Sequence, residues 1–175
     1  QVLSSIESDA TSPGSIAGRA FDRLAFGDHP YATSSDGTPE SVAGLTRGDL
    51  VAARDAVLAR DRVYVAAVGD IDAATLGALL DRLLGALPAE GAAPPGRAPF
   101  LVRGGVTVVD YASPQSTVVF GQAGIARDDP DFFAAFVLNQ ILGGSGFTAR
   151  LMAEVREKRG LTSGISTALV TMQFA

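Results

Sequence analysis

The chain contains a single imidazole, His29, in the segment His29-Pro30-Tyr31. A neutral histidine in such a loop could act as a general base or as a lone metal ligand. Hydrolytic zinc sites need three protein ligands in suitable geometry, whereas this chain offers one His and no Cys. We therefore favour a structural interpretation, in which His29 packs in a loop and hydrogen-bonds a carbonyl group.

Composition excludes several other classes of chemistry. The absence of Cys rules out disulfides, thiolate zinc sites, iron–sulfur clusters and cysteine nucleophiles. No His follows the hydroxyl groups of Ser163, Ser166 and Thr167, so we expect no Ser–His–Asp triad. The 175 residues include 14 Lys and Arg against 19 Asp and Glu, a formal net charge of −5. Because nucleic-acid binding needs a basic face, we expect no nucleic-acid partner.

The segment Gly143-Gly144-Ser145-Gly146 could place free amides around a phosphate at the start of the next helix. It lacks a following Lys-Ser/Thr pair and does not follow a predicted strand, so neither nucleotide-binding fingerprint is met. The structural interpretation is a flexible connection between two helices that requires positive φ angles. Recognition of a peptide by this exposed backbone remains open.

Charged residues recur after the glycines. Arg150, Glu154 and Lys158 are four residues apart, which predicts a stripe of solvated ion pairs along one helix face. Arg156 lies on a different face of the same predicted helix. A stripe of this kind is more typical of a solvated surface than of an active site.

The elements that must position these residues are both helical and strand-like. Hydroxyl or carboxylate caps predict helix starts at Thr38, at Thr46 with Asp49 as a capping box, and at Asp72. Gly27 and Gly160 are expected to end helices. We expect helices over about 1–12, 15–26, 46–59, 73–86 and 148–159, and strands over about 62–70, 105–110, 116–125 and 164–174.

Irregular alternation of helices and strands predicts an α+β fold. A helix opening at Asp128-Asp129-Pro130 should fill the interior with its apolar residues, which are Phe132, Phe133, Phe136, Val137 and Ile141. Proline, glycine and alanine dominate residues 88–99, which predicts a linker. No run approaches the roughly 18 apolar residues of a membrane span. The chain begins at Gln1 inside a predicted helix and stops inside a predicted strand, so we expect an excised piece of a longer protein.

Several motifs together resemble one enzyme family. These motifs, in chain order, are 26–31 (FGDHPY), 37–40 (GTPE), 45–50 (LTRGDL), 68–72 (VGDID), 127–131 (RDDPD), 142–151 (LGGSGFTARL) and 154–161 (EVREKRGL). On these the sequence resembles the pitrilysin/insulinase-type zinc metallopeptidases, which include the mitochondrial processing peptidases and bacterial zinc protease homologues.

The resemblance implies two homologous α+β halves that face each other like a clamshell around a peptide chamber. Each half would be a mainly antiparallel sheet packed by helices. Residues 1–87 would end the first half, 88–99 would be the linker, and 100–175 would begin the second, truncated half.

The resemblance also implies that this piece is not catalytic. Catalytic members carry His-x-x-Glu-His and a more distant Glu in the first half. The motif is absent from this chain, and Ser5 stands where the distant Glu is expected, with Glu7 two residues away. No catalytic residue, metal ligand or cofactor is therefore expected here, and zinc would be held by a partner or an upstream segment.

Substrate-binding residues are carried over from the same resemblance. Arg156 matches a family Arg that contacts peptide, although the Tyr expected seven residues later is replaced by Ser163. Residues Gly143, Gly144, Ser145 and Gly146 match the position of a loop that binds substrate in some non-catalytic subunits. The implied partners are a peptide and a homologous zinc-bearing subunit or half, in a periplasmic or membrane-peripheral setting.

Two alternatives stay open. The parent could be an active zinc endopeptidase whose metal motif lies upstream, or a structural scaffold that makes no contact with peptide. As an isolated piece, the chain would carry a half-domain at each end with apolar sheet edges unpaired, and we expect dimerisation or strand exchange between copies.

Overall fold

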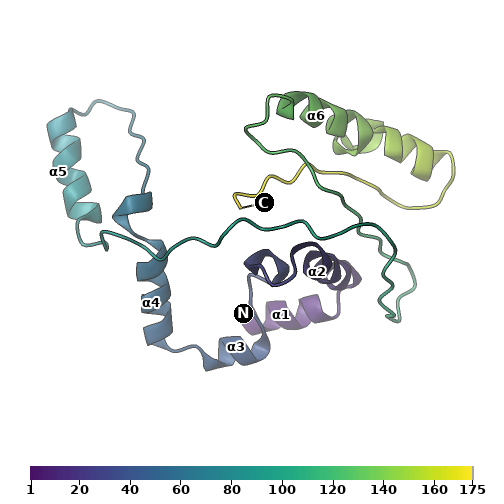
Figure 1. Ribbon diagram of the computed structural model, residues 1–175, viewed down its shortest axis with the longest axis horizontal. Helices are drawn as coiled ribbons and strands as arrows, with labels where there is room; N and C mark the ends of the chain where they lie inside the picture. Colours follow the sequence, from purple (N-terminus) through teal and green to yellow (C-terminus); the bar gives the residue numbers. More distant parts are fainter. Residues whose placement is uncertain (175) are drawn as a thin grey trace. The chain divides into compact units, whose positions relative to one another are not determined.

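The computed structural model describes residues 1–174, and in this range every regular element is a helix (Figure 1). The α-helices are α1 (Val2–Ala10), α2 (Pro13–Phe26), α3 (Pro39–Gly44), α4 (Arg47–Val57), α5 (Ala73–Leu84) and α6 (Phe132–Asn139). Short 3-10 turns are η1 (Pro30–Ala32), η2 (Arg60–Arg62) and η4 (Gly146–Thr148), and wider π-helical turns are η3 (Gln140–Gly144) and η5 (Met152–Glu157).

The predicted α+β fold of antiparallel sheets is wrong for this structure. No strand is assigned between residues 1 and 174, and the segments predicted as strands, 62–70, 105–110, 116–125 and 164–174, run as non-helical connections (Figure 1). β-Branched residues favour an extended backbone, but a sheet exists only where a second strand supplies the ladder of hydrogen bonds. That partner is a non-local requirement, and within the described residues these segments do not meet it.

The helix starts follow the capping chemistry of the sequence. The Thr46 hydroxyl accepts the Asp49 N–H at 3.3 Å, and the Asp49 carboxylate accepts the Thr46 N–H at 2.8 Å, so the predicted capping box is confirmed. The Thr38 hydroxyl likewise accepts the Ser41 N–H at 3.2 Å, with Pro39 in the first helical position. Asp72 caps α5 as predicted. These caps satisfy amide groups that a helix cannot pair internally.

The chain divides into two compact units. One contains Gln1–Ala10 with Ser34–Pro95, and the other contains Thr11–Thr33 with the chain from Gly96 onward. The change from one unit to the other after Pro95 falls inside the predicted linker, 88–99. The assignment of 1–87 and 100–175 to two homologous halves concerns ancestry rather than compactness, and it stays a prediction.

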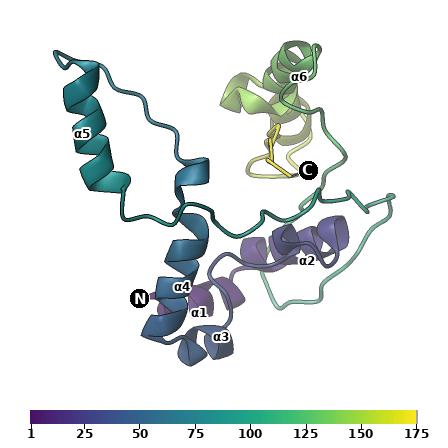
Figure 2. The same ribbon diagram turned by 60° about the vertical axis from the view of Figure 1, so that its left-hand side comes forward.

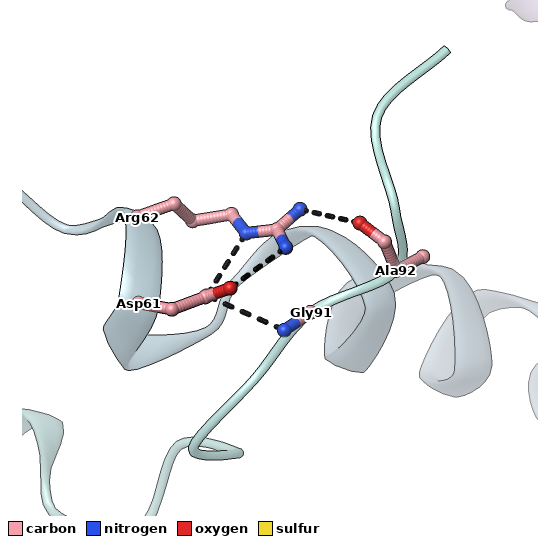
Figure 3. Close-up of polar contacts among 4 residues, drawn as sticks. All are labelled: Asp61, Arg62, Gly91 and Ala92. Carbon is pink, nitrogen blue, oxygen red and sulfur yellow. Dashed lines mark hydrogen bonds and ion pairs between the residues drawn. The ribbon is translucent and has the colours of Figure 1, made fainter. Parts of the chain in front are cut away.

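The start of the predicted linker is bound to the first unit. Arg62 pairs with Asp61 through two contacts of 3.0 Å, and its Nη1 donates to the Ala92 carbonyl at 2.9 Å (Figure 3). The Asp61 carboxylate also accepts the Gly91 N–H at 3.3 Å. The Ala92 N–H donates to the Ala56 carbonyl at 2.9 Å. Residues 88–92 are therefore a docked segment.

In the second unit a small core forms around the end of α2. Ala25 and Phe26 are buried together with Ala32 and Ala98. The Leu101 N–H donates to the Ala25 carbonyl at 2.8 Å, which holds residues 98–102 against the helix end. Gly27 ends α2 as predicted, with a φ of 57°.

Other apolar faces remain uncovered within the described residues. Only Phe132 of the α6 residues is buried, while Phe133 and Val137 are 74% and 54% exposed, and Ile141, just beyond the helix, is 53% exposed. Phe136 is 43% exposed as well, so the prediction that these side chains fill an interior is wrong for Phe133, Phe136, Val137 and Ile141. Helix α5 stands apart from α4 in both views, and its Leu83 is 74% exposed (Figures 1 and 2). A helix buries its apolar face only where another element faces it.

Candidate functional site

The glycine-rich segment begins inside a π-helical turn that continues α6. Gly143 is buried in this turn, and a Cβ at this position would collide with the side chain and backbone nitrogen of Thr167. The Thr167 N–H donates to the Gly143 carbonyl at 3.2 Å. The absence of a side chain at 143 is therefore required by the close approach of residues 165–169, and Gly143 does not face solvent.

The remaining residues of the segment are exposed and internally braced. The Ser145 hydroxyl donates to the Gln140 carbonyl at 2.8 Å, and the Thr148 hydroxyl donates to the Ser145 carbonyl at 3.2 Å. Gly146 has a φ of 66°, a conformation that side chains disfavour. The segment is thus a built turn with Gly144, Ser145 and Gly146 at its surface, and the predicted flexible connection needs positive φ only at Gly146.

Phe147 joins the glycine-rich segment to Arg156. The Arg156 Cζ lies 5.0 Å from the centroid of the Phe147 ring, within the range of a cation–π interaction. Two of the predicted substrate-binding features, the segment 143–146 and Arg156, therefore meet through this ring. Sequence patterns alone assign no role to Phe147, and the one signal for it is an aromatic residue directly after Gly146.

The charged residues near Arg156 form ion pairs with one another and not with Arg156. Glu154 contacts Lys158 Nζ at 2.5 Å and Arg159 Nη1 at 3.2 Å. These cations, Lys158 foremost, hold the pKa of Glu154 below its usual range. The predicted Glu154–Lys158 pair is confirmed, whereas Arg150 joins no ion pair found among residues 1–174. Arg156 joins none in that range either.

The C-terminal segment lies against the same helical turns. The Ile165 N–H contacts the sulfur of buried Met152 at 3.4 Å, and Asn139 Nδ2 donates to the Thr167 carbonyl at 3.4 Å. The Thr167 hydroxyl is buried, and no hydrogen-bond partner for it exists among the described residues. Thr167 therefore contributes packing beneath the glycine-rich segment.

His29 has the structural role that the sequence favoured. Its Nδ1 accepts the Tyr31 N–H at 3.2 Å, so its Nε2 carries the proton and donates to the Gly96 carbonyl at 2.9 Å. The predicted hydrogen bond to a carbonyl is confirmed. Both ring nitrogens are occupied within the chain, and this imidazole therefore does not suit a metal ion.

Potential metal ligands are otherwise scattered. No group of three or more His, Asp or Glu side chains within residues 1–174 is arranged to hold a metal ion. Ser5 and Glu7 both lie on α1. In the same part of the chain, no helix is long and apolar enough to cross a bilayer.

The chain is similar in sequence to known peptidase-family proteins. Residues 44–172 match the family described as the peptidase M16 inactive domain. An uncharacterized zinc protease of Mycobacterium leprae is 32% identical over 96% of this chain and 38% of its own length. A probable mitochondrial-processing peptidase subunit beta of Schizosaccharomyces pombe is 28% identical over 70% of this chain and 29% of its own length.

A solved structure agrees with these relatives. The crystal structure of a peptidase M16 inactive domain from Pseudomonas fluorescens superposes with a TM-score of 0.71 and 34% identity, over 99% of this chain and 42% of that one. The chain thus spans about two fifths of the length of the zinc protease and of this solved chain. The resemblance to pitrilysin-type peptidases is confirmed, and the chain belongs to the peptidase M16 inactive-domain family.

Proposed function

We propose that this chain forms part of the wall of a peptide-binding chamber, in a non-catalytic region that pairs with a zinc-bearing homologue. The main support for the proposal is the environment of Arg156. This side chain is held next to the exposed part of the glycine-rich segment and joins no ion pair among the described residues. Its guanidinium has donors available for a peptide carbonyl or carboxylate.

The exposed backbone beside Arg156 supports the same proposal. Gly144 and Gly146 lack side chains that would keep an extended peptide away from the main chain. The turn is braced by the Ser145–Gln140 hydrogen bond, so little ordering is needed when a peptide binds. Gly143 is buried beneath this surface, and we do not propose that it contacts peptide.

The donor set of this chain does not fit a zinc ion. Its one imidazole is engaged through both nitrogens, and a serine hydroxyl stands at the position aligned with the family's distant Glu. We therefore place the zinc on a partner or another region of the parent protein and route no chemical step through this chain.

The test uses the full-length parent protein together with its zinc-bearing homologue. Arg156→Ala should weaken binding of a fluorescein-labelled unstructured peptide by about 10- to 100-fold, because hydrogen bonds to a charged group contribute about 1.5–3 kcal/mol. Arg150→Ala, an exposed arginine of the same region, is the matched control and should bind normally. Equal affinity of the Arg156→Ala and parent proteins would favour the scaffold alternative.

The names of the relatives favour one other function. Several mycobacterial relatives are described as zinc proteases, so the parent of this chain could itself be an active zinc endopeptidase. Zinc analysis of the full-length protein purified alone separates the two functions. Stoichiometric zinc with chelator-sensitive peptide hydrolysis would establish the endopeptidase, and metal-free inactive protein would support the non-catalytic region.

A further inference from the structure

We propose that Phe147 is the positioning residue for Arg156, fixing its guanidinium for contact with peptide. This inference rests on the proposed function. The turn after the glycines would thus orient the Arg156 guanidinium, in addition to any contact that the backbone of the turn makes with peptide.

The turn holds Phe147 in one place. Phe147 is the middle residue of η4, which is closed by the Ala149 N–H donating to the Gly146 carbonyl at 3.1 Å. The Thr148 hydroxyl ties the turn to the Ser145 carbonyl, and Ala149 is fully buried beneath it. Phe147 is 70% exposed, so its side chain projects from the braced turn without filling a core.

The ring holds the cation without neutralising it. A carboxylate partner would occupy guanidinium donors and cancel the charge, as Glu154 does for Lys158 and Arg159. An aromatic face attracts a cation through its quadrupole and leaves the positive charge in place. Arg156 is therefore restrained in position while its charge stays available to a ligand.

The alternative restraints on Arg156 are few among the described residues. Glu154, two residues earlier, is committed to Lys158 and Arg159. A long arginine side chain loses considerable rotamer freedom when it is fixed. Without the ring, that loss would fall on the step of peptide binding, and affinity would drop.

Five variants of the full-length parent, the single Arg156→Ala among them, test this assignment by anisotropy of the labelled peptide in the presence of the zinc-bearing homologue. Phe147→Leu keeps an apolar side chain but removes the aromatic face, and should weaken binding about two- to fivefold. Phe147→Trp keeps an aromatic face and should bind peptide with the parental affinity. Phe133→Leu changes another exposed phenylalanine and should leave binding unchanged.

The double variant Phe147→Leu/Arg156→Ala gives the decisive comparison. If the ring acts through Arg156, adding Phe147→Leu to Arg156→Ala should cause no further loss. An equal further loss, or failure of Phe147→Trp to restore affinity, would overturn the positioning role. Loss of binding in Arg156→Ala with normal binding in Phe147→Leu would overturn this inference alone. Normal binding in Arg156→Ala would overturn the proposed function as well.

A spectroscopic readout accompanies the binding data. The Arg156 Cζ lies 5.0 Å from the Phe147 ring centroid. We therefore expect Phe147→Leu to shift the Arg156 Nε–H resonance while leaving the Arg150 resonance in place. An unshifted Arg156 resonance would contradict the contact itself. The melting temperature of each variant should match that of the parent protein, since the ring is exposed.

Discussion

Thr167 and Gly143, 24 positions apart in the sequence, lie so close that no side chain fits between them. The Thr167 N–H donates to the Gly143 carbonyl at 3.2 Å, and this bond joins the C-terminal segment to the π-helical turn. The glycine at 143 is therefore needed for packing, whereas Gly146 is needed for its positive φ.

Gly143→Ala should destabilise the protein by about 1–3 kcal/mol, because the added methyl group forces Thr167 away from the turn. Gly18→Ala is the matched control, since Gly18 lies within α2 and a Cβ there meets no atom within 4 Å. That change should stabilise by about 0.5–1 kcal/mol through helix propensity. Urea denaturation of the full-length protein measures both values. Equal stability of the two variants would contradict the close packing at 143.

Thr167→Val should leave stability unchanged or raise it by about 1 kcal/mol. The Thr167 hydroxyl is buried and has no partner among the described residues, so it has lost its hydration without a compensating hydrogen bond. Thr167→Ser keeps the hydroxyl and removes the methyl group, and should destabilise by about 1 kcal/mol. Thermal denaturation distinguishes these signs. Destabilisation by Thr167→Val would mean that the hydroxyl is hydrogen-bonded.

The helix cap at Asp72 predicts a defined response to acid. Hydrogen bonds from the Thr75 N–H, at 2.8 Å, and then from the Thr75 hydroxyl lower the pKa of Asp72 below its ordinary value of 3.8. The stabilisation is therefore present above pH 3.8 and is lost as the pH falls through the lower folded-state pKa. Burial raises the pKa of Asp22, whose contribution has the opposite sign.

Asp72→Asn keeps a good capping side chain but cannot be protonated. Its free energy of unfolding should therefore fall less than that of the parent protein between pH 5 and pH 3, measured by urea denaturation at each pH. Asp70→Asn removes a charge two residues earlier and controls for net charge. A pH profile of Asp72→Asn that coincides with the parent profile would refute the capping contribution.

Gly91→Ala should release the docked start of the linker. A Cβ at Gly91 would collide with the Arg62 guanidinium and lie 2.6 Å from the Ala56 carbonyl oxygen. Cleavage by elastase within residues 88–93 should become faster by a factor of about five or more, since overpacking costs about 1 kcal/mol or more. Gly96→Ala meets no atom within 4 Å and should be cleaved at the parental rate. Mass spectrometry of the fragments locates the cuts.

The isolated chain of 175 residues should self-associate. Phe133 and Val106 are 74% and 91% exposed, and they belong to a large set of exposed apolar side chains. Contiguous apolar surface favours association in water. Light scattering across a concentration series measures the mass, and a monodisperse monomer at every concentration would contradict this expectation.

Local chemistry was predictable from the sequence, and long-range pairing was not. The Thr46–Asp49 capping box joins residues three positions apart, so its side chains meet whenever the helix forms. The predicted strand at 105–110 required a partner strand elsewhere in the chain, and no such ladder occurs within residues 1–174. β-Branched residues alone therefore predicted strands that do not form among the described residues.

The candidate site divides in the same way. The role of Arg156 was predicted from a family resemblance. Its contact with Phe147 depends on the orientation of two turns whose residues are nine positions apart. The reason for glycine at 143 depends on Thr167, which no local pattern identifies. In contrast, the carbonyl hydrogen bond of His29 was predictable because the chain offers no further imidazole or thiol to share a metal.

The docked linker start has a consequence for the backbone that follows it. The Ala92 N–H is bound to the Ala56 carbonyl and the Gly96 carbonyl is bound to His29, so three residues, 93–95, lie between these anchored points. Pro94 and Pro95 have fixed φ angles, and a residue that precedes proline has a restricted backbone. Few torsions are left to rotate. Residues 93–95 should therefore form a short stiff connection and not a slack tether.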